Sequence, residues 1–178
     1  MDDAWIVALL RDAPYGVLAT VDAGQPFVNT NLFVFDEARH CVYLHTARLG
    51  RTRTNIEDAE AANEAVCFAV STMGRLLPAD EALEFSVEYS GVTIFGSACV
   101  ITDAAEQRYG LQLLLDKYFP HLQPGRDYRP IVDEELKRTS VFRVDIREWS
   151  GKQKQVGEDF PGAFSMDDLP ALRGDTGP

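Results

Sequence analysis

The sequence predicts an α+β domain that is mainly β, with six antiparallel strands and flanking helices. Three short segments with alternating apolar residues follow one another near the N-terminus, and only short turns at 22–26 and 36–40 separate them. That arrangement is typical of an antiparallel meander. A longer segment, 87–101, carries apolar residues on both faces, as expected for a barrel wall that is covered on two sides.

Each element follows from periodicity and from the turn and helix signals around it. In chain order, we expect a helix over 3–12, strands over 15–21, 27–35 and from 41 onward, a helix from 51 to about 62, a strand over 65–71, a loop over 72–85, a strand over 87–101, a helix from 103 to 118, a loop or short helix over 120–138, and a last strand over 139–149. Pro14 and Pro120 end the helices that precede them. Asp103, three residues before Glu106, resembles the start of a capping box.

Length and charge limit the classes of function. A chain of 178 residues fits one domain, which we place at 1–155, followed by a tail at 156–178 that is loosely packed or wrapped on a neighbour. A net charge of −11 argues against broad affinity for nucleic acid or for an anionic membrane. No apolar run approaches the roughly 20 residues that span a bilayer. The acidic N-terminus lacks a signal-peptide pattern and the three cysteines are far apart, so we expect a cytoplasmic protein with reduced thiols.

Three arginines, Arg48, Arg51 and Arg53, lie where the strand from Cys41 gives way to a helix. Cations at a helix N-terminus oppose the helix dipole at a cost of roughly 0.3–1 kcal/mol each. A bound phosphate would remove that cost, because helix N-termini and guanidinium groups both accept phosphate. The alternative is a solvated basic turn in which Arg53 pairs with Glu57 one helical turn later.

Asn29 and Asn31 share one face of the second strand with Phe27, Phe33 and Phe35. Each carboxamide offers a donor and an acceptor. The pair suits a flat heterocycle such as a flavin or a nucleobase. The alternative is that both residues cap a strand bulge or face solvent.

His45 and Trp149 are the other candidate ligand contacts. His45 ends the third strand beside the arginines, where it either contacts a cofactor or serves as a structural residue. Trp149 falls on the polar face of the last strand and needs a partner surface or a ring ligand, unless it covers the end of the barrel. No nucleophile motif and no metal-ligand spacing are present, so we identify no catalytic residue and expect no metal site.

Four segments in order resemble one known family. Residues 16–26 resemble its opening hairpin, 43–51 its cofactor-phosphate segment, 90–98 its long strand and 141–152 its final strand. The sequence is thereby similar to the pyridoxamine 5′-phosphate oxidase-like FMN-binding split barrels, in the branch of the nitroimidazole-resistance-type proteins. The resemblance implies a six-stranded antiparallel Greek-key split barrel and a homodimer with FMN at the interface.

The resemblance also implies roles for individual residues. Asn29, Thr30 and Asn31 would line the flavin ring, and His45 and Thr46 would follow the ring and the ribityl chain. Arg48, Arg51 and Thr52 would hold the phosphate, although relatives commonly carry Lys at the position of Thr52. Trp149 and Lys152 would close the site from the partner subunit.

The resemblance implies an FMN-dependent oxidoreductase that reduces a small organic acceptor. Its electron donor and physiological substrate are not identified. Two alternatives remain open. One is a module that binds flavin or haem without turnover, and the other is a deazaflavin-dependent reductase on the same barrel.

Overall fold

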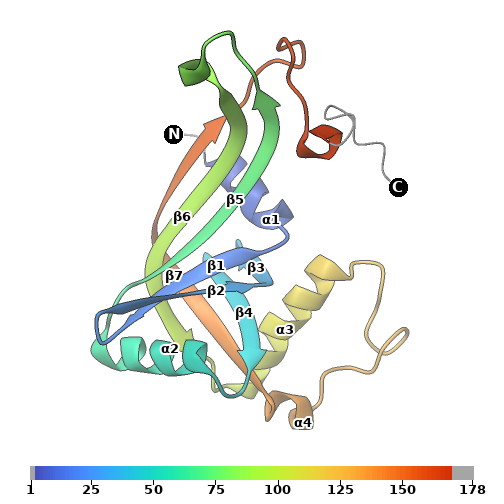
Figure 1. Cartoon of the computed structure of the whole chain (residues 1–178). Coiled ribbons are helices and arrows are strands. Elements are labelled where there is room, and N and C mark those ends of the chain that lie inside the picture. Colours follow the sequence, from blue (N-terminus) through green and yellow to red (C-terminus); the bar gives the residue numbers. More distant parts are fainter. Residues whose placement is uncertain (1–2, 170–178) are drawn as a thin grey trace, which may run out of the picture. The chain divides into compact units, whose positions relative to one another are not determined.

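The computed structural model of the chain describes residues 3–169, and its strands form one seven-stranded sheet (Figure 1). The elements in chain order are α1 (Ala4–Asp12), β1 (Gly16–Asp22), β2 (Gln25–Asn31), β3 (Phe33–Asp36), β4 (Cys41–Ala47), α2 (Arg51–Ala62), β5 (Val66–Leu77), the 3₁₀ turn η1 (Ala82–Glu84), β6 (Ser86–Val100), α3 (Ala104–Tyr118), α4 (Asp133–Leu136), β7 (Thr139–Lys154) and the 3₁₀ turn η2 (Met166–Asp168). The predicted mainly β fold with flanking helices is confirmed.

The strand order in the sheet is β2-β1-β5-β6-β7-β4-β3. The pairs β1–β2, β1–β5, β3–β4 and β4–β7 are antiparallel. Strand β2 therefore pairs along its whole length with β1, in a register that places Asn29 opposite Leu18. Strand β4 pairs with β7, and His45 lies opposite Val141.

The prediction of one strand over 27–35 was wrong, because the chain breaks at Leu32 into β2 and β3. The hydroxyl of Tyr118, on α3, accepts a hydrogen bond from the Phe33 amide at 3.0 Å and lies 2.8 Å from the carbonyl oxygen of Pro14. A side chain distant in sequence thus supplies a contact at the break. As a consequence, the sheet has seven strands where the sequence predicted six.

The prediction of a loop over 72–85 was also wrong for its first half, because β5 continues to Leu77. Residues 71–74 of this strand are all exposed, so no alternation of apolar and polar residues marks them as a strand.

The helix prediction for α3 is confirmed, since the Asp103 carboxylate accepts a hydrogen bond from the Glu106 amide at 2.8 Å.

The core lies between the sheet and the helices of the larger of two compact units. This unit contains the described residues up to Val70 together with Val92–Ser150, and the second contains 71–91 with the described part of 151–178. Fully buried core side chains include Leu10 of α1, Leu44 of β4 and Ile56 of α2. Helices α1, α2 and α3 thus each contribute buried apolar side chains to the core.

The second unit is built from the outer ends of β5, β6 and β7 and from the tail that follows them. Arg75 forms a two-pronged ion pair with Glu88 and also donates to the carbonyl oxygens of Val156 and Gly157. Further along, Leu76 and Phe164 exchange both backbone hydrogen bonds. The tail is thus attached to β5 as far as Phe164. The predicted tail also includes 170–178, which lie outside the described residues.

Candidate functional site

A polar group on β2 faces the start of α2. The Asn29 amide nitrogen donates to the hydroxyl of Thr52 at 2.9 Å and to the side-chain oxygen of Asn31 at 3.3 Å. Asn31 donates in turn to the Asn29 carbonyl at 3.2 Å. Phe27, Asn29 and Asn31 alternate as half-buried residues, whereas Thr30 points to the exposed opposite face. The structure therefore brings Asn29, Asn31 and Thr52 together and leaves Thr30 outside the group.

The first turn of α2 lies beside this polar group. Gly50 precedes the helix with φ +149°, a conformation that side-chain-bearing residues rarely adopt, and no side chain caps the helix. The first amides of an α-helix have no intrahelical acceptor. The Arg51 guanidinium lies 5.0 Å from the centroid of the Phe27 ring, as in a cation–π contact. Uncapped amides, a cation and two carboxamides thus occur at one end of one helix.

The other two arginines of the cluster lie on a different side. Arg48 donates to the backbone carbonyl of Lys137 at 2.9 Å, and Arg53 donates to the Ser140 hydroxyl at 2.9 Å. The alternative pair between Arg53 and Glu57 also forms, with a nitrogen–oxygen distance of 2.6 Å. Residues two apart in a helix point in nearly opposite directions. Arg51 and Arg53 therefore face opposite sides of α2, and the sequence cluster divides into two groups.

His45 lines an apolar cavity of about 300 Å³ between β4, α3 and the segment that follows α3. Three leucines of α3, Leu111, Leu114 and Leu115, form one wall. Among residues 3–169, no side chain or backbone group forms a hydrogen bond with the His45 ring. Partial burial of the ring lowers the pKa of His45. The neighbouring Thr46 hydroxyl donates to the carbonyl of Ala47 at 2.9 Å.

Trp149 and Lys152 have contacts of other kinds. The Trp149 ring lies 4.7 Å from His40 and 5.9 Å from Phe35, measured between ring centroids, and its indole nitrogen donates to Asp3. Lys152 belongs to the second unit, where its ammonium lies 5.4 Å from the centroid of Tyr89. Within one chain, these contacts of Trp149 are those of a residue that covers the end of a core. Their predicted role across a subunit interface stays a prediction.

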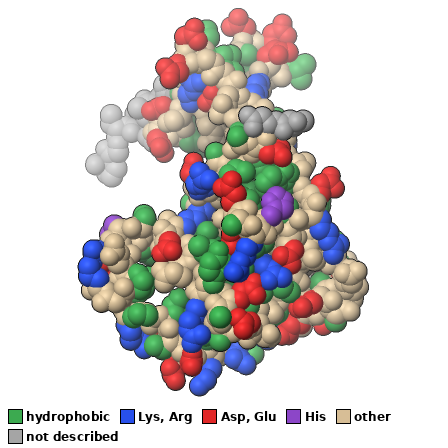
Figure 2. All heavy atoms as spheres, turned by 180° about the vertical axis from the view of Figure 1, so that it is seen from behind, with side chains coloured by type: hydrophobic (Ala, Val, Ile, Leu, Met, Phe, Trp, Pro, Cys, Tyr) green, Lys and Arg blue, Asp and Glu red, His purple; other side chains and the backbone are tan. Residues whose placement is uncertain are grey.

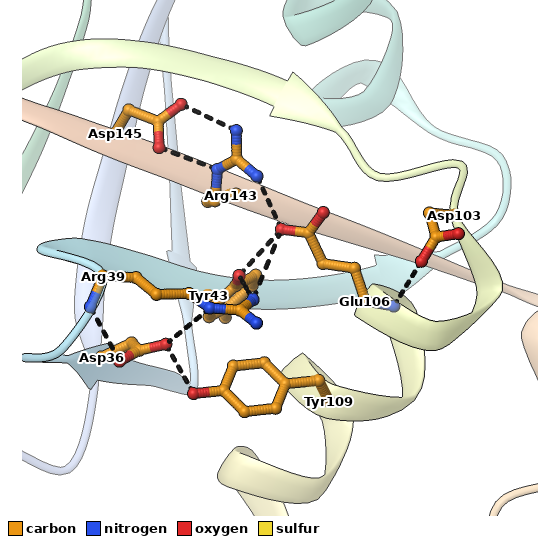
Figure 3. Close-up of polar contacts among 8 residues, drawn as sticks. All are labelled: Asp36, Arg39, Tyr43, Asp103, Glu106, Tyr109, Arg143 and Asp145. Carbon is orange, nitrogen blue, oxygen red and sulfur yellow. Dashed lines mark hydrogen bonds and ion pairs between the residues drawn. The ribbon is translucent and has the colours of Figure 1, made fainter.

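Sequence reasoning missed a network of charged and phenolic groups between α3, β4 and β7 (Figure 3). Glu106 of α3 accepts hydrogen bonds from the Tyr43 hydroxyl at 2.8 Å and from Arg143 at 2.6 Å, and Arg143 also binds Asp145 at 2.7 Å. Tyr109 donates to Asp36 at 2.8 Å. In the sequence, the alternation of Arg143 and Asp145 on the last strand was the signal that could have indicated this network. The network attaches α3 to the sheet, and its acids and bases are paired with one another.

Electrostatics in this network favour charged carboxylates. Burial opposes ionisation of Glu106, but the hydrogen bonds from Arg143 and Tyr43 outweigh it and lower the pKa of Glu106 below its ordinary value. Burial also raises the pKa of the Tyr43 hydroxyl, which therefore stays a donor.

Over the lower part of the face shown in Figure 2, acidic and basic side chains are interspersed. Anion binding on that face would therefore depend on small local groups of cations.

The pKa of Glu106 leads to a testable change in stability. Replacing Glu106 by Gln is expected to lower the free energy of unfolding at pH 7 by about 1–3 kcal/mol, because bonds to a charged acceptor are lost. A depressed pKa adds stability above the ordinary glutamate value of 4.5 and loses it at lower pH. The difference between the two proteins should therefore shrink as the pH falls below 4.5. Urea unfolding between pH 3 and 8 measures it.

Glu37→Gln is the matched control, because the Glu37 carboxylate forms an exposed pair with Arg11 and no other printed bond among the described residues. Exposed pairs contribute roughly 0–1 kcal/mol. Equal losses for the two variants, or a loss that does not change with pH, would contradict the proposed role of Glu106.

The fold and its seven-stranded sheet are those of an antiparallel split barrel with flanking helices. The sequence profile described as pyridoxamine 5′-phosphate oxidase matches residues 2–153. The chain therefore belongs to that family. A search of curated proteins gave no match.

Solved structures with the same fold include three informative cases. The flavocytochrome Anf3 from Azotobacter vinelandii has a TM-score of 0.73 and 23% identity, over 93% of this chain and 78% of that one. The FAD and heme binding protein from Mycobacterium smegmatis has a TM-score of 0.72 and 24% identity, over 94% and 76%. A proposed 5-nitroimidazole antibiotic resistance protein from Bacteroides thetaiotaomicron has a TM-score of 0.66 and 18% identity, over 85% and 84%.

The described residues contain neither a candidate metal-ion cluster nor a candidate membrane-spanning helix. No group of three or more His, Cys, Asp and Glu side chains within 3–169 is arranged to hold a metal ion. None of the helices described has both the length and the apolar character needed to cross a bilayer.

Proposed function

We propose that this protein is an FMN-binding oxidoreductase that reduces a small organic acceptor. The observation that carries the proposal is the hydrogen-bonded group of Asn29, Asn31 and Thr52 beside the uncapped start of α2. Family membership supports it, as do the flavin-binding proteins among the structures with this fold.

Each part of the group has a chemical task in this proposal. The first amides of α2, the Thr52 hydroxyl and the Arg51 guanidinium would hold the FMN phosphate, since a helix N-terminus favours a dianion. Asn29 and Asn31 would present donors and acceptors to the flavin ring. Bound FMN would supply hydride or electron transfer, while these residues orient it and exclude water.

A homodimer is part of the proposal. Asn29 and Asn31 are only half-buried on the edge strand β2, so a second subunit could cover a ligand that rests on them. Trp149 and Lys152 would then contribute from the partner, as the family resemblance implies. We also propose a cytoplasmic location, in keeping with three free cysteines.

Flavin titration of the purified protein tests the proposal. We expect the visible spectrum of flavin in the protein as purified, or a saturable change on addition of FMN at micromolar concentration. Bound FMN should then be reduced by a nicotinamide donor and reoxidised by a quinone or nitroaromatic acceptor. Absence of both bound flavin and titratable binding would reject the proposal. Preference for a deazaflavin over FMN would favour the deazaflavin-dependent alternative.

A second candidate function is a module that binds haem, and the His45 cavity favours it. A haem iron can be held by one proximal His, which must offer an unprotonated ring nitrogen. The His45 ring has no hydrogen-bond partner among the described residues and lies beside a wall of leucines, so these residues would offer an iron ligand and an apolar surface for a porphyrin. Of the proteins with this fold, one is an FAD and heme binding protein and another is a flavocytochrome.

Replacing His45 by Ala separates this candidate from the first. If His45 ligates haem iron, titration with ferric haem should give a saturable Soret band in the wild-type protein, and His45→Ala should lose it. His121→Ala, in an exposed segment, is the matched control and should keep the band. Identical haem spectra for all three proteins would remove His45 as a ligand, and FMN binding can be measured independently.

A further inference from the structure

A second cationic pocket lies on the side of α2 away from Asn29. It has a volume of about 410 Å³ and is lined by residues of α2, the end of β6, the start of α3, α4 and the start of β7. These elements lie near one another at the lower end of Figure 1. Arg48, Arg53 and Lys137 line it, and Asp133 is the one acidic residue among its lining residues. Asp133 already pairs with Arg108. Arg53 is likewise paired with Glu57. Arg48 and Lys137 are therefore the lining cations without an ion pair among the described residues, and they give the pocket a local excess of positive charge in a chain of net charge −11.

The remaining lining is suited to a base and a sugar. Val100, Ile101 and Leu136 give an apolar surface on which a flat ring can rest. Gln107 donates its amide nitrogen to the Ile101 carbonyl at 2.7 Å, which leaves its side-chain oxygen as an acceptor for an exocyclic amine. Cations, an apolar surface and one carboxamide acceptor together match the three parts of an adenine nucleotide.

The two anion-binding groups are joined by α2 itself. Arg51 contacts the Phe27 ring on one side of the helix, and Arg53 lines this pocket on the other. A helix with its side chains is only about 10–12 Å across. The diphosphate of a dinucleotide could therefore pass the uncapped end of α2, with its two halves on opposite sides.

We propose that the pocket lined by Arg53, Lys137 and Gln107 binds the adenosine-phosphate part of a dinucleotide. The choice of a dinucleotide rests on the proposed flavin function, whereas the pocket stands on its own geometry. The adenosine-phosphate part has two possible sources, FAD in place of FMN or a nicotinamide dinucleotide that donates electrons.

Calorimetric titration of the full chain with ADP tests the shared chemistry. Lys137→Ala is the first variant, because the Lys137 side chain is exposed and its loss should not disturb folding. Arg53→Gln is the second; Gln retains a donor for Ser140 but releases the Glu57 carboxylate beside the pocket. Each should weaken ADP binding about tenfold, the effect of one lost charged contact. Arg126→Ala removes one charge from an exposed pair outside the pocket and should leave ADP binding unchanged.

Titrations with FMN, FAD, NADH and NADPH distinguish the sources. If FAD is the source, FAD binds the wild type more tightly than FMN does, and both variants weaken FAD without affecting FMN. If the donor is the source, FAD and FMN bind equally and the variants weaken NADH or NADPH. ADP that fails to bind at millimolar concentration, or binds all variants equally, overturns the proposal. Binding of ADP without FMN would reject the flavin function but leave the pocket as a nucleotide site.

Discussion

Gly96→Ala is expected to destabilise the fold by about 3 kcal/mol or more. A Cβ atom at position 96 would lie 2.0 Å from the carbonyl oxygen of Asp145 and 3.0 Å from its carbonyl carbon. Both atoms belong to the backbone of β7, the neighbour of β6 in the middle of the sheet. A backbone cannot move aside as the end of a side chain can, so the two central strands would have to separate. Equilibrium unfolding in urea measures the loss.

Gly24→Ala is the matched control for this substitution. Gly24 has φ +79°, and a Cβ atom there meets nothing within 4 Å. Its replacement should cost only about 1–2 kcal/mol from the unfavourable backbone conformation. If both variants lost the same stability, the close approach of β6 to β7 would not be the reason for glycine at position 96.

Arg51→Ala is expected to weaken FMN binding by about 1.5–3 kcal/mol, roughly 10- to 150-fold, if Arg51 forms a charged contact with the phosphate. The reason lies in what surrounds this guanidinium. Its described contact is the Phe27 ring, and no carboxylate of residues 3–169 forms an ion pair with it. Fluorescence titration with FMN measures the change, and titration with riboflavin, which lacks the phosphate, should show a much smaller one.

The control for Arg51→Ala must remove the same charge elsewhere on an acidic protein. Arg129→Ala does so, because Arg129 forms an exposed pair with Glu135 and lies outside the proposed phosphate group. It should leave the FMN dissociation constant unchanged. An unchanged constant for Arg51→Ala as well would exclude Arg51 from the site and leave the start of α2 without its proposed role.

The elements that the sequence predicted well have local signals. The helix α2 begins at Arg51 and ends at Ala62, and α3 begins after the Asp103 cap, as predicted. The failures have tertiary causes. Tyr118 of α3 accepts a hydrogen bond from the Phe33 amide, directly after the break at Leu32 that divides one predicted strand. The exposed middle of β5 is held by its neighbours in the sheet, without a buried face of its own.

Prediction of the site was limited in the same way. The residue types of the Arg cluster and of the Asn pair were visible in the sequence. Which neighbour each arginine meets on the two sides of α2 depends on how the helix packs against β2 and β7. The hydrogen bond from Asn29 to Thr52 joins residues that are 23 apart, and the network around Glu106 joins three elements. Such contacts need the sheet order, which periodicity does not provide.

The different partners of Arg51 and Arg53 determine the order in which the two parts of a long anionic ligand would bind. Stacking on the Phe27 ring leaves the charge of Arg51 uncompensated, so an approaching phosphate displaces nothing there. Arg53 is already bound to Glu57, and an anion must compete with that carboxylate. The β2 side of the helix would therefore bind its phosphate first, and the far side would bind more slowly, because the ligand must displace Glu57 from Arg53 there.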